Sequence, residues 1–348
     1  MGTLHVIRPG VSIDKSGRKP PTKKHGIRKI TQQAWWPWLK RGFTLAFFML
    51  VAWLLVSQAR AIDWPAVLAA LRTYSLSSLL TAAGLAVASY TLYSCFDLLG
   101  RRYTGHTLAA PTVMLVTAVS YAFNLNLGSW VGGIAFRYRL YSRLGLAVGT
   151  VTRVMSLSML ANWIGYMLLA GAVFAFQPPT LPATWKISTS GLHWIGFGLL
   201  AVAAAYLALC AFSRQRVFML RGHEVDLPSL PMALLQVLMG AANWLLMSGI
   251  IYVLLQQRVE FSAIISVLLL AAIAGVITHV PANLGVLEAV FVALLSHVVA
   301  KPELLAALVA YRVLYYLVPL AIAGAAYLAL ELSARRLAAD QLTIRLKN

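Results

Sequence analysis

Asn124-Leu-Asn-Leu-Gly-Ser129, followed by Gly132-Gly133, interrupts one long apolar segment, and His279-Val-Pro-Ala-Asn-Leu-Gly285 interrupts another. Proline lacks a backbone N–H donor, and glycine and asparagine tolerate turn conformations, so these residues tend to end helices. Each segment is therefore predicted to consist of two helices joined by a break within apolar sequence. The predicted break residues are Gly128, Gly132, Gly133, Pro281 and Gly285.

The rest of the chain is equally apolar. Hydrophobic residues make up 60% of the 348 and charged residues only 11%, whereas soluble domains carry roughly a quarter charged residues. We therefore predict an all-α polytopic membrane domain over 42–332, between a basic flexible cytoplasmic tail at 1–41 and a cytoplasmic C-terminal tail at 333–348. All but the first of its apolar segments exceed the roughly 20 residues that a transmembrane helix needs. The segments are 43–59, 76–100, 111–136, 154–176, 192–212, 231–255, 262–298 and 304–332.

The interrupted segments 111–136 and 262–298 either cross the membrane with a kink or return as re-entrant hairpins to the side from which they came. Lys and Arg concentrate in cytoplasmic loops, and the loops between residues 59 and 303 hold fourteen of them. Eight full crossings would leave only four inside, whereas six crossings and two hairpins leave nine inside, so we favour the hairpins. The nine are Arg101, Arg102, Arg137, Arg139, Arg143, Arg153, Arg214, Arg216 and Arg221; the five outside are Arg60, Arg72, Lys186, Arg258 and Lys301.

This topology makes the two halves of the chain, about 43–176 and 192–332, inverted repeats. Asn126-Leu-Gly128 and Asn283-Leu-Gly285 lie 157 residues apart at matching points of the two halves, and each is followed by an arginine at the start of a span, Arg153 or Arg312. Inverted repeats whose interrupted helices meet near the midplane are a recurring plan of transporters, in which helix ends and freed backbone groups form the substrate site.

Two ionisable residues of the second half lie within apolar sequence, where each needs a partner or a function. Glu288 could cap its own loop, or it could face a polar cavity and bind a cation, carry a proton or pair with Arg312. Arg312 could simply pair with Glu288, or its planar, permanently charged group could hold a phosphate. The two roles of Arg312 are compatible with each other.

Other candidates are weaker. Arg153 is expected nearer the cytoplasmic surface, with its charge reaching water, and Asp97 is expected to pair locally with Arg101, four residues on. His279 could titrate near neutral pH but is more simply a hydrogen-bonded residue. The predicted headgroup-binding set is Arg312, Glu288, Asn126, Asn283, Arg153 and Tyr315, and a polar path could also include Asn124, Asn162 and Asn243, although the last two serve equally well as interhelical hydrogen-bonding residues.

Several functional classes find no support in the sequence. The net charge of +19 fits loop charge that orients a membrane protein better than a nucleic-acid partner. The two cysteines, Cys95 and Cys210, lie in apolar segments, so a disulfide framework and a thiolate metal site are not expected. There is no nucleotide-binding glycine loop and no metal-ligand motif. We therefore expect no cofactor, no metal and no catalytic residue.

The two interrupted stretches, read through as Tyr121–145 and 279–291 together with Ala310-Tyr-Arg-Val-Leu-Tyr-Tyr316, resemble the YbhN-type inner-membrane proteins of Gram-negative bacteria. That family is similar to the membrane (flippase-like) domain of lysylphosphatidylglycerol synthases, a domain associated with moving lipids between leaflets. The resemblance covers nearly everything after residue 35. The wider group commonly has an acidic residue where this chain has Gly133, so equivalent chemistry at the two breaks is not implied.

The resemblance implies a multi-pass protein of the bacterial cytoplasmic (inner) membrane with both termini in the cytoplasm. Since no soluble aminoacyl-transfer domain follows residue 332, lysyl transfer is not expected. The leading hypothesis is a lipid translocator or lipid-transport factor that handles a phospholipid or polyprenyl-phosphate headgroup, with Arg312 on the phosphate and Glu288 balancing charge. Anionic membrane lipids are the expected partners. Alternatives are a non-catalytic partner of a lipid synthase and, with less support, an intramembrane lipid-modifying enzyme.

Overall fold

The computed structural model describes residues 64–182, 185, 187–214, 217–220, 223–278 and 280–329. The predicted tails, the first apolar segment at 43–59 and His279 lie outside these residues. Within them, seven helices are long and apolar enough to cross a membrane, which confirms a multi-pass helical protein. The seven are Leu76–Thr104, Ala110–Leu127, Val148–Phe176, Thr189–Phe212, Leu230–Leu254, Phe261–Thr278 and Lys301–Ala329.

The first half of the described chain contains the helices on either side of the first predicted break. The elements are α3 (Trp64–Leu71), α4 (Leu76–Ser94), α5 (Phe96–Thr104), α6 (Ala110–Leu127), the π-helix η1 (Ser129–Ala135), α7 (Phe136–Arg143) and α8 (Val148–Phe176). The segment predicted at 111–136 is therefore α6 together with η1, and α7 continues it beyond the predicted end.

The second half comprises α9 (Thr189–Phe212), the strands β1 (Val217–Leu220) and β2 (His223–Asp226), α10 (Leu230–Leu254), α11 (Phe261–Thr278), the 3₁₀ turn η2 (Pro281–Asn283), α12 (Val286–Leu295), α13 (Lys301–Arg312) and the π-helix η3 (Val313–Leu317), after which the last helix runs on to Ala329. After α9 and its two strands, the second half repeats the order of span, helical hairpin and span that runs from α4 to α8 in the first. The segment predicted at 262–298 is α11, η2 and α12. The antiparallel pair β1–β2 in the α9–α10 connection adds a small hairpin to the expected all-α fold.

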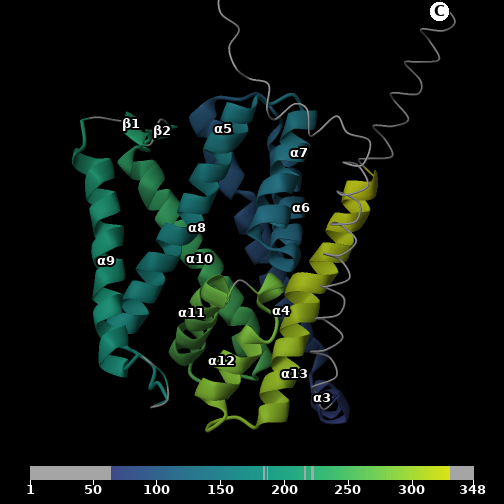
Figure 1. Cartoon of the computed structure of the whole chain (residues 1–348). Coiled ribbons are helices and arrows are strands. Elements are labelled where there is room, and N and C mark those ends of the chain that lie inside the picture. Colours follow the sequence, from purple (N-terminus) through teal and green to yellow (C-terminus); the bar gives the residue numbers. More distant parts are fainter. Residues whose placement is uncertain are drawn as a thin grey trace, which may run out of the picture. The chain divides into compact units, whose positions relative to one another are not determined.

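Both interrupted segments double back on themselves. α6 ends at Leu127, Gly128 has a positive φ of 83° that suits glycine, and η1 and α7 then return beside α6. At the other break, Ala282, Asn283 and Gly285 have φ of 56°, 54° and 75°, and α12 returns beside α11. Figure 1 places the α6–α7 pair toward the upper end, with α5, and the α11–α12 pair toward the lower end, with α3.

The close return of η1 along α6 depends on glycine. A Cβ at Gly132 would lie 2.1 Å from the carbonyl oxygen of Phe123, and one at Gly133 would lie 2.8 Å from the side-chain oxygen of Asn124. Backbone atoms cannot move away from such a clash without disturbing the hairpin, whereas Asn124 can rotate. Gly132 is thus the position at which the first break most strictly requires glycine.

Replacing Gly132 by Ala should destabilise the protein by about 1–3 kcal/mol, because the added methyl overpacks the α6–η1 contact. The matched control is Gly149→Ala in the first turn of α8, where a Cβ meets no described atom within 4 Å. Thermal unfolding of the detergent-solubilised variants checks this, and equal melting temperatures for the two would contradict the tight return of η1.

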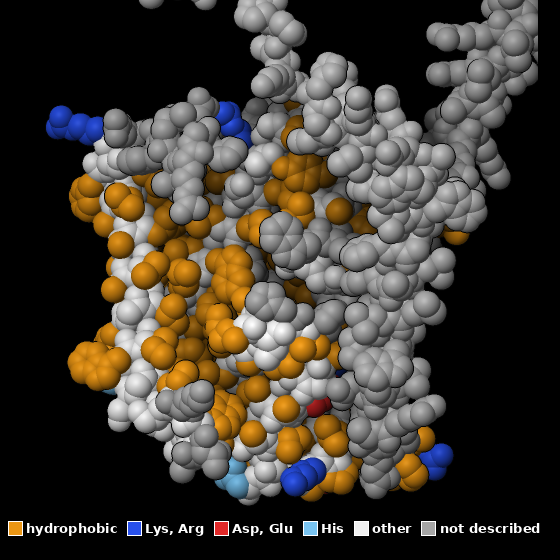
Figure 2. Space-filling model, viewed as in Figure 1, with side chains coloured by type: hydrophobic (Ala, Val, Ile, Leu, Met, Phe, Trp, Pro, Cys, Tyr) orange, Lys and Arg blue, Asp and Glu red, His pale blue; other side chains and the backbone are white. Residues whose placement is uncertain are grey.

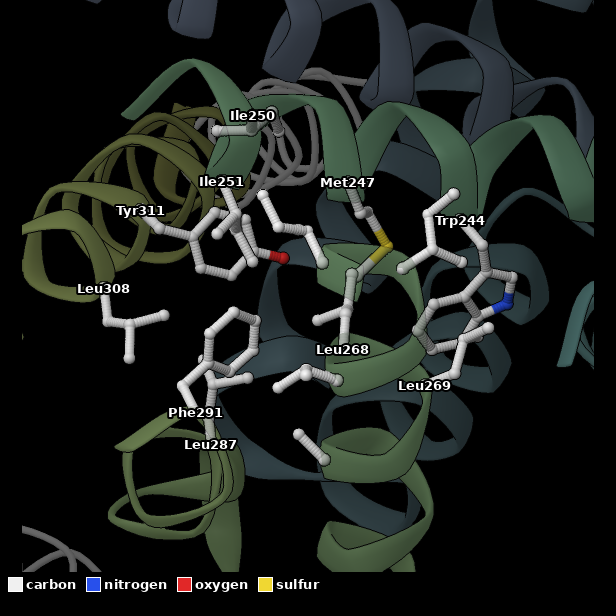
Figure 3. Close-up of a cluster of buried hydrophobic side chains, with 14 of the residues drawn as sticks. Trp244, Met247, Ile250, Ile251, Leu268, Leu269, Leu287, Phe291, Leu308 and Tyr311 are labelled. Atoms are coloured by element: carbon white, nitrogen blue, oxygen red, sulfur yellow. The ribbon is translucent and has the colours of Figure 1, made fainter. Parts of the chain in front are cut away.

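The described surface and interior suit a lipid environment. Figure 2 shows one face on which apolar side chains cover the middle, while Lys and Arg lie toward the two ends. Inside, the second hairpin packs in an apolar cluster with α10 and α13 (Figure 3), and its returning helix is therefore held by protein on several sides. The labelled members of this cluster are Trp244, Met247, Ile250, Ile251, Leu268, Leu269, Leu287, Phe291, Leu308 and Tyr311.

Candidate functional site

The second hairpin carries a buried ion pair. Arg312, at the end of α13, donates from Nε to Glu288 Oε1 and from Nη2 to Glu288 Oε2, the latter at 3.0 Å. Their side chains are 12% and 17% exposed. This two-bond arrangement is the strong, directional form of a guanidinium–carboxylate contact. The pairing considered from the sequence is therefore present.

Arg312 also holds the backbone of the break. Its Nη1 donates to the carbonyl of Ala282 at 3.0 Å, and its Nη2 donates to the carbonyl of Asn283 at 2.9 Å. The left-handed turn at these two residues leaves their carbonyls outside any regular helix, and buried carbonyls need a donor. Arg312 thus binds both the turn at Ala282 and Asn283 and the returning helix α12, and so connects the two parts of the hairpin tip.

The two predicted asparagines stabilise neighbouring backbone. Asn283 donates from Nδ2 to the carbonyl of Ala271 at 3.1 Å, and Asn126 donates to the carbonyls of Ala122 and Tyr316 at 2.8 and 3.2 Å. Asn126 therefore connects the first hairpin to the last helix near Arg312. The predicted roles of both asparagines in headgroup binding stay predictions.

Tyr315 belongs to a buried polar network at the centre of the protein. Its hydroxyl lies 2.6 Å from Ser89 Oγ and 2.9 Å from the Tyr121 hydroxyl, and Ser89 donates to Asn243 Oδ1 at 2.7 Å. The four side chains come from η3, α4, α6 and α10, and Tyr315 is fully buried. Asn243 therefore makes the interhelical hydrogen bond considered from the sequence. Contact between Tyr315 and a headgroup stays a prediction.

A π-helical turn shapes the last span at this network. The wider turn of η3 includes Tyr315 and Tyr316, whose carbonyls accept bonds from outside the helix, Tyr90 hydroxyl to Tyr315 at 3.1 Å and the Asn126 amide to Tyr316. π turns are uncommon and are often found at functional sites. The first hairpin contains the other π segment of the described chain, η1, so each half carries one such irregularity.

The first hairpin holds a second buried ion pair, which sequence reasoning missed. Arg137 of α7 is 3% exposed, and its Nε lies 3.5 Å from Oδ2 of Asp97, which is fully buried on α5. The same carboxylate oxygen accepts a 2.8 Å hydrogen bond from the Tyr141 hydroxyl. The expected local pair of Asp97 with Arg101 is wrong, because Arg101 donates from Nε to the carbonyl of Leu108 instead.

In the sequence, Arg137 directly follows the apolar segment 111–136 and so counts as a loop charge. Nothing local to either residue connects it to Asp97, forty positions earlier. Arg153 is exposed in the second turn of α8, in keeping with a charge that reaches water. The counterpart of the Arg312–Glu288 pair in the first half is therefore Arg137–Asp97, with the guanidinium on the returning helix and the carboxylate on another span.

These features define a polytopic helical membrane protein in which two interrupted helices fold back beside buried ion pairs. The chain belongs to the family described as the lysylphosphatidylglycerol synthase TM region, whose model matches residues 42–323. It is 48% identical to the inner membrane protein YbhN of Escherichia coli K12 over 305 residues, which is 87% of this chain and 96% of that protein. It is also 32% identical over 294 residues, 83% of this chain, to 90% of an uncharacterized protein, slr0712, of Synechocystis. These matches and the apolar helices support a multi-pass inner-membrane protein.

Proposed function

We propose that this protein is a lipid translocator or lipid-transport factor of the inner membrane that handles a phospholipid or polyprenyl-phosphate headgroup. The observation that carries the proposal is the pair of helical hairpins, each with a buried guanidinium–carboxylate pair and an irregular backbone, within an otherwise apolar helical bundle. Charged groups inside a membrane protein mark substrate or ion pathways, and the family membership points to lipid as the cargo.

The proposed topology is six spans and two re-entrant hairpins in inverted repeats, with the upper end of Figure 1 facing the cytoplasm. Two observations support it: the hairpins lie toward opposite ends of the bundle, and the described loop arginines are more frequent near the ends of α5 and α7, the start of α8 and the end of α9 than at the opposite end. Positive charge of this kind favours the cytoplasmic side.

Cysteine labelling tests the orientation. Tyr141 is buried, so the neighbouring exposed Ser142 is the better position at the end of α7, and the exposed Ser296 after α12 reports on the other side. In a background with Cys95 and Cys210 replaced, a membrane-impermeant thiol reagent added to intact cells should modify Ser296→Cys and leave Ser142→Cys unmodified until the cells are opened. Modification of Ser142→Cys in intact cells would show that the protein has the opposite orientation in the membrane.

We propose that Arg312 and Glu288 control the second hairpin tip and that a headgroup phosphate competes for Arg312 with its present partners. Asn126, Asn283, Tyr315 and Arg153 complete the proposed set. The proposed activity moves lipid without chemical change, so the protein would not act as an enzyme.

The double variant Glu288→Gln/Arg312→Gln should reduce lipid movement in reconstituted vesicles by at least about tenfold, since it removes the charge that binds phosphate while preserving hydrogen-bonding groups. The matched control is Arg258→Gln/Glu303→Gln, which alters an exposed ion pair whose side chains are 53% and 44% accessible. Movement is read as the dithionite-accessible fraction of a fluorescent phospholipid. Equal rates for the two double variants would refute the role of the buried pair.

The competing functions give different results. A docking partner of a lipid synthase should lose function in cells when residues 1–34 are deleted, whereas a translocator should keep moving lipid in vesicles. A lipid-modifying enzyme should change the mass of the added lipid, which mass spectrometry of the recovered vesicles detects.

A further inference from the structure

A polar cavity of about 90 Å³ lies between the first hairpin and α8. Its volume exceeds several-fold the roughly 15 Å³ that one water molecule needs, so it has room for a small group of atoms. α4 contributes one residue to the wall, α6, η1 and α7 of the first hairpin contribute a larger part, and α8 contributes the rest. The lining residues are Tyr93, Ser120, Asn124, Ser129, Gly133, Ile134, Arg137, Met155, Met159, Asn162 and Trp163.

Three polar atoms of this wall have no hydrogen-bond partner among the described residues. They are Oγ of the fully buried Ser120, Oδ1 of Asn124 and Nε of Arg137. Buried polar atoms are nearly always hydrogen-bonded, by protein, water or ligand. Three such atoms around one cavity therefore indicate that the cavity is built to receive a polar group.

The charge of the residues that line the cavity indicates that the bound group should be negatively charged. Arg137 is the charged residue among the lining residues, and Asp97 is not part of the described wall. The Asp97 carboxylate pairs with Arg137 and accepts a hydrogen bond from Tyr141. A group inside the cavity would therefore meet Arg137 and the hydroxyl and amide groups of Ser120, Ser129 and Asn162, which line the same wall.

The two buried arginines differ in how their donors are used. Arg312 makes four hydrogen bonds to Glu288 and to backbone carbonyls. Nε of Arg137, 3.5 Å from its carboxylate, makes none within the described chain. The Arg137 guanidinium also contacts Tyr93, so Nε is the donor that a ligand could bind without first breaking a hydrogen bond.

We propose that this cavity binds a phosphate group, that of a phospholipid headgroup, with Arg137 as its cationic ligand and Ser120 and Asn162 as hydrogen-bond donors. A planar guanidinium suits phosphate oxygens. Gly133 also lines the cavity, and a Cβ there would lie 2.8 Å from Oδ1 of Asn124, so a larger residue at this position would crowd the wall. The proposal rests on the proposed lipid-handling function, and it adds a phosphate site at the first hairpin to the one proposed at Arg312 of the second.

Binding to the purified full chain in a phosphate-free nonionic detergent tests the site by isothermal titration calorimetry. The probes are dihexanoyl-phosphatidylglycerol, dihexanoylglycerol, which lacks the phosphate, and inorganic phosphate. The first should bind and the second should not. Ser120→Ala should weaken phosphatidylglycerol binding about tenfold, and the charge-neutral double variant Asp97→Asn/Arg137→Gln should weaken it at least about a hundredfold.

The control is Ser158→Ala. Ser158 is also fully buried with an unpartnered hydroxyl among the described residues, but it does not line the cavity, so its variant should bind like the unaltered protein. Equal losses for Ser120→Ala and Ser158→Ala, or unchanged binding by the double variant, would overturn the site. Inorganic phosphate binding as tightly as the lipid, with the same response to the variants, would overturn the lipid as its source.

The binding result is separable from the proposed function. If lipid moves in vesicles but these variants bind phosphatidylglycerol normally, the cavity is not the headgroup site and the function stands. If the binding pattern holds but no lipid moves, the site stands and translocation is refuted.

Discussion

Arg312→Gln should destabilise the protein by about 3–5 kcal/mol, because removing one member of a buried ion pair leaves an uncompensated charge. The side chains of Arg312 and Glu288 are only 12% and 17% exposed, so water screens little of the interaction. The variant also weakens the hold on the carbonyls of Ala282 and Asn283, which belong to the turn of the second hairpin.

Equilibrium unfolding in mixed micelles measures this loss. Glu288→Gln/Arg312→Gln should recover part of the stability, since two neutral amides replace the unpaired charge. Arg258→Gln breaks an exposed pair at the end of the protein and should cost no more than about 1 kcal/mol. If Arg312→Gln lowered the free energy of unfolding as little as Arg258→Gln does, Arg312 would not stabilise the hairpin.

Gly240→Leu should be the most damaging change at the crossing of α8 and α10, with a loss of at least about 3 kcal/mol from overpacking against backbone. A Cβ at Gly240 would lie 2.1 Å from the carbonyl oxygen of Ala161 and 2.9 Å from Cα of Gly165, and one at Gly165 would lie 2.3 Å from the carbonyl carbon of Gly240. Small residues permit such close helix contacts in membranes.

Gly84→Leu is the matched control for that substitution. Gly84 also lies within a long helix, α4, but it is exposed and a Cβ there meets no described atom within 4 Å. The yield of monodisperse protein after detergent extraction and its melting temperature should fall for Gly240→Leu and stay near the unaltered values for Gly84→Leu. Comparable behaviour of the two variants would contradict the direct contact of α8 and α10.

The breaks and spans could be predicted because their signals are local. Apolar length gave the approximate positions of the described spans, and Gly128 and Gly285 have the positive φ that breaks require. The approximate ends of the helices at the two breaks could be predicted from the Pro, Gly and Asn residues there. The topology relative to the membrane is set by charges spread over several loops, and it stays a prediction that Ser142 and Ser296 can test.

The ion pair of the first hairpin could not be predicted because its members are distant in sequence. Asp97 has a plausible local partner in Arg101, and only the packing of α7 against the bundle brings Arg137 to it. Burial of Tyr315 has a similar cause, since its hydroxyl contacts come from two other helices. The β1–β2 hairpin is short and lies in a connection, where apolar periodicity carries little information.

The buried charges occur as couples of opposite sign, Arg137 with Asp97 and Arg312 with Glu288. A transmembrane voltage acts on net charge, at about 2.3 kcal/mol per elementary charge per 100 mV. As long as each couple stays closed, shifting it along the bilayer normal does no electrical work. If the proposed lipid transport depends on membrane potential, these two pairs would not be the source of that dependence, and the charge of the transported lipid would be the first candidate.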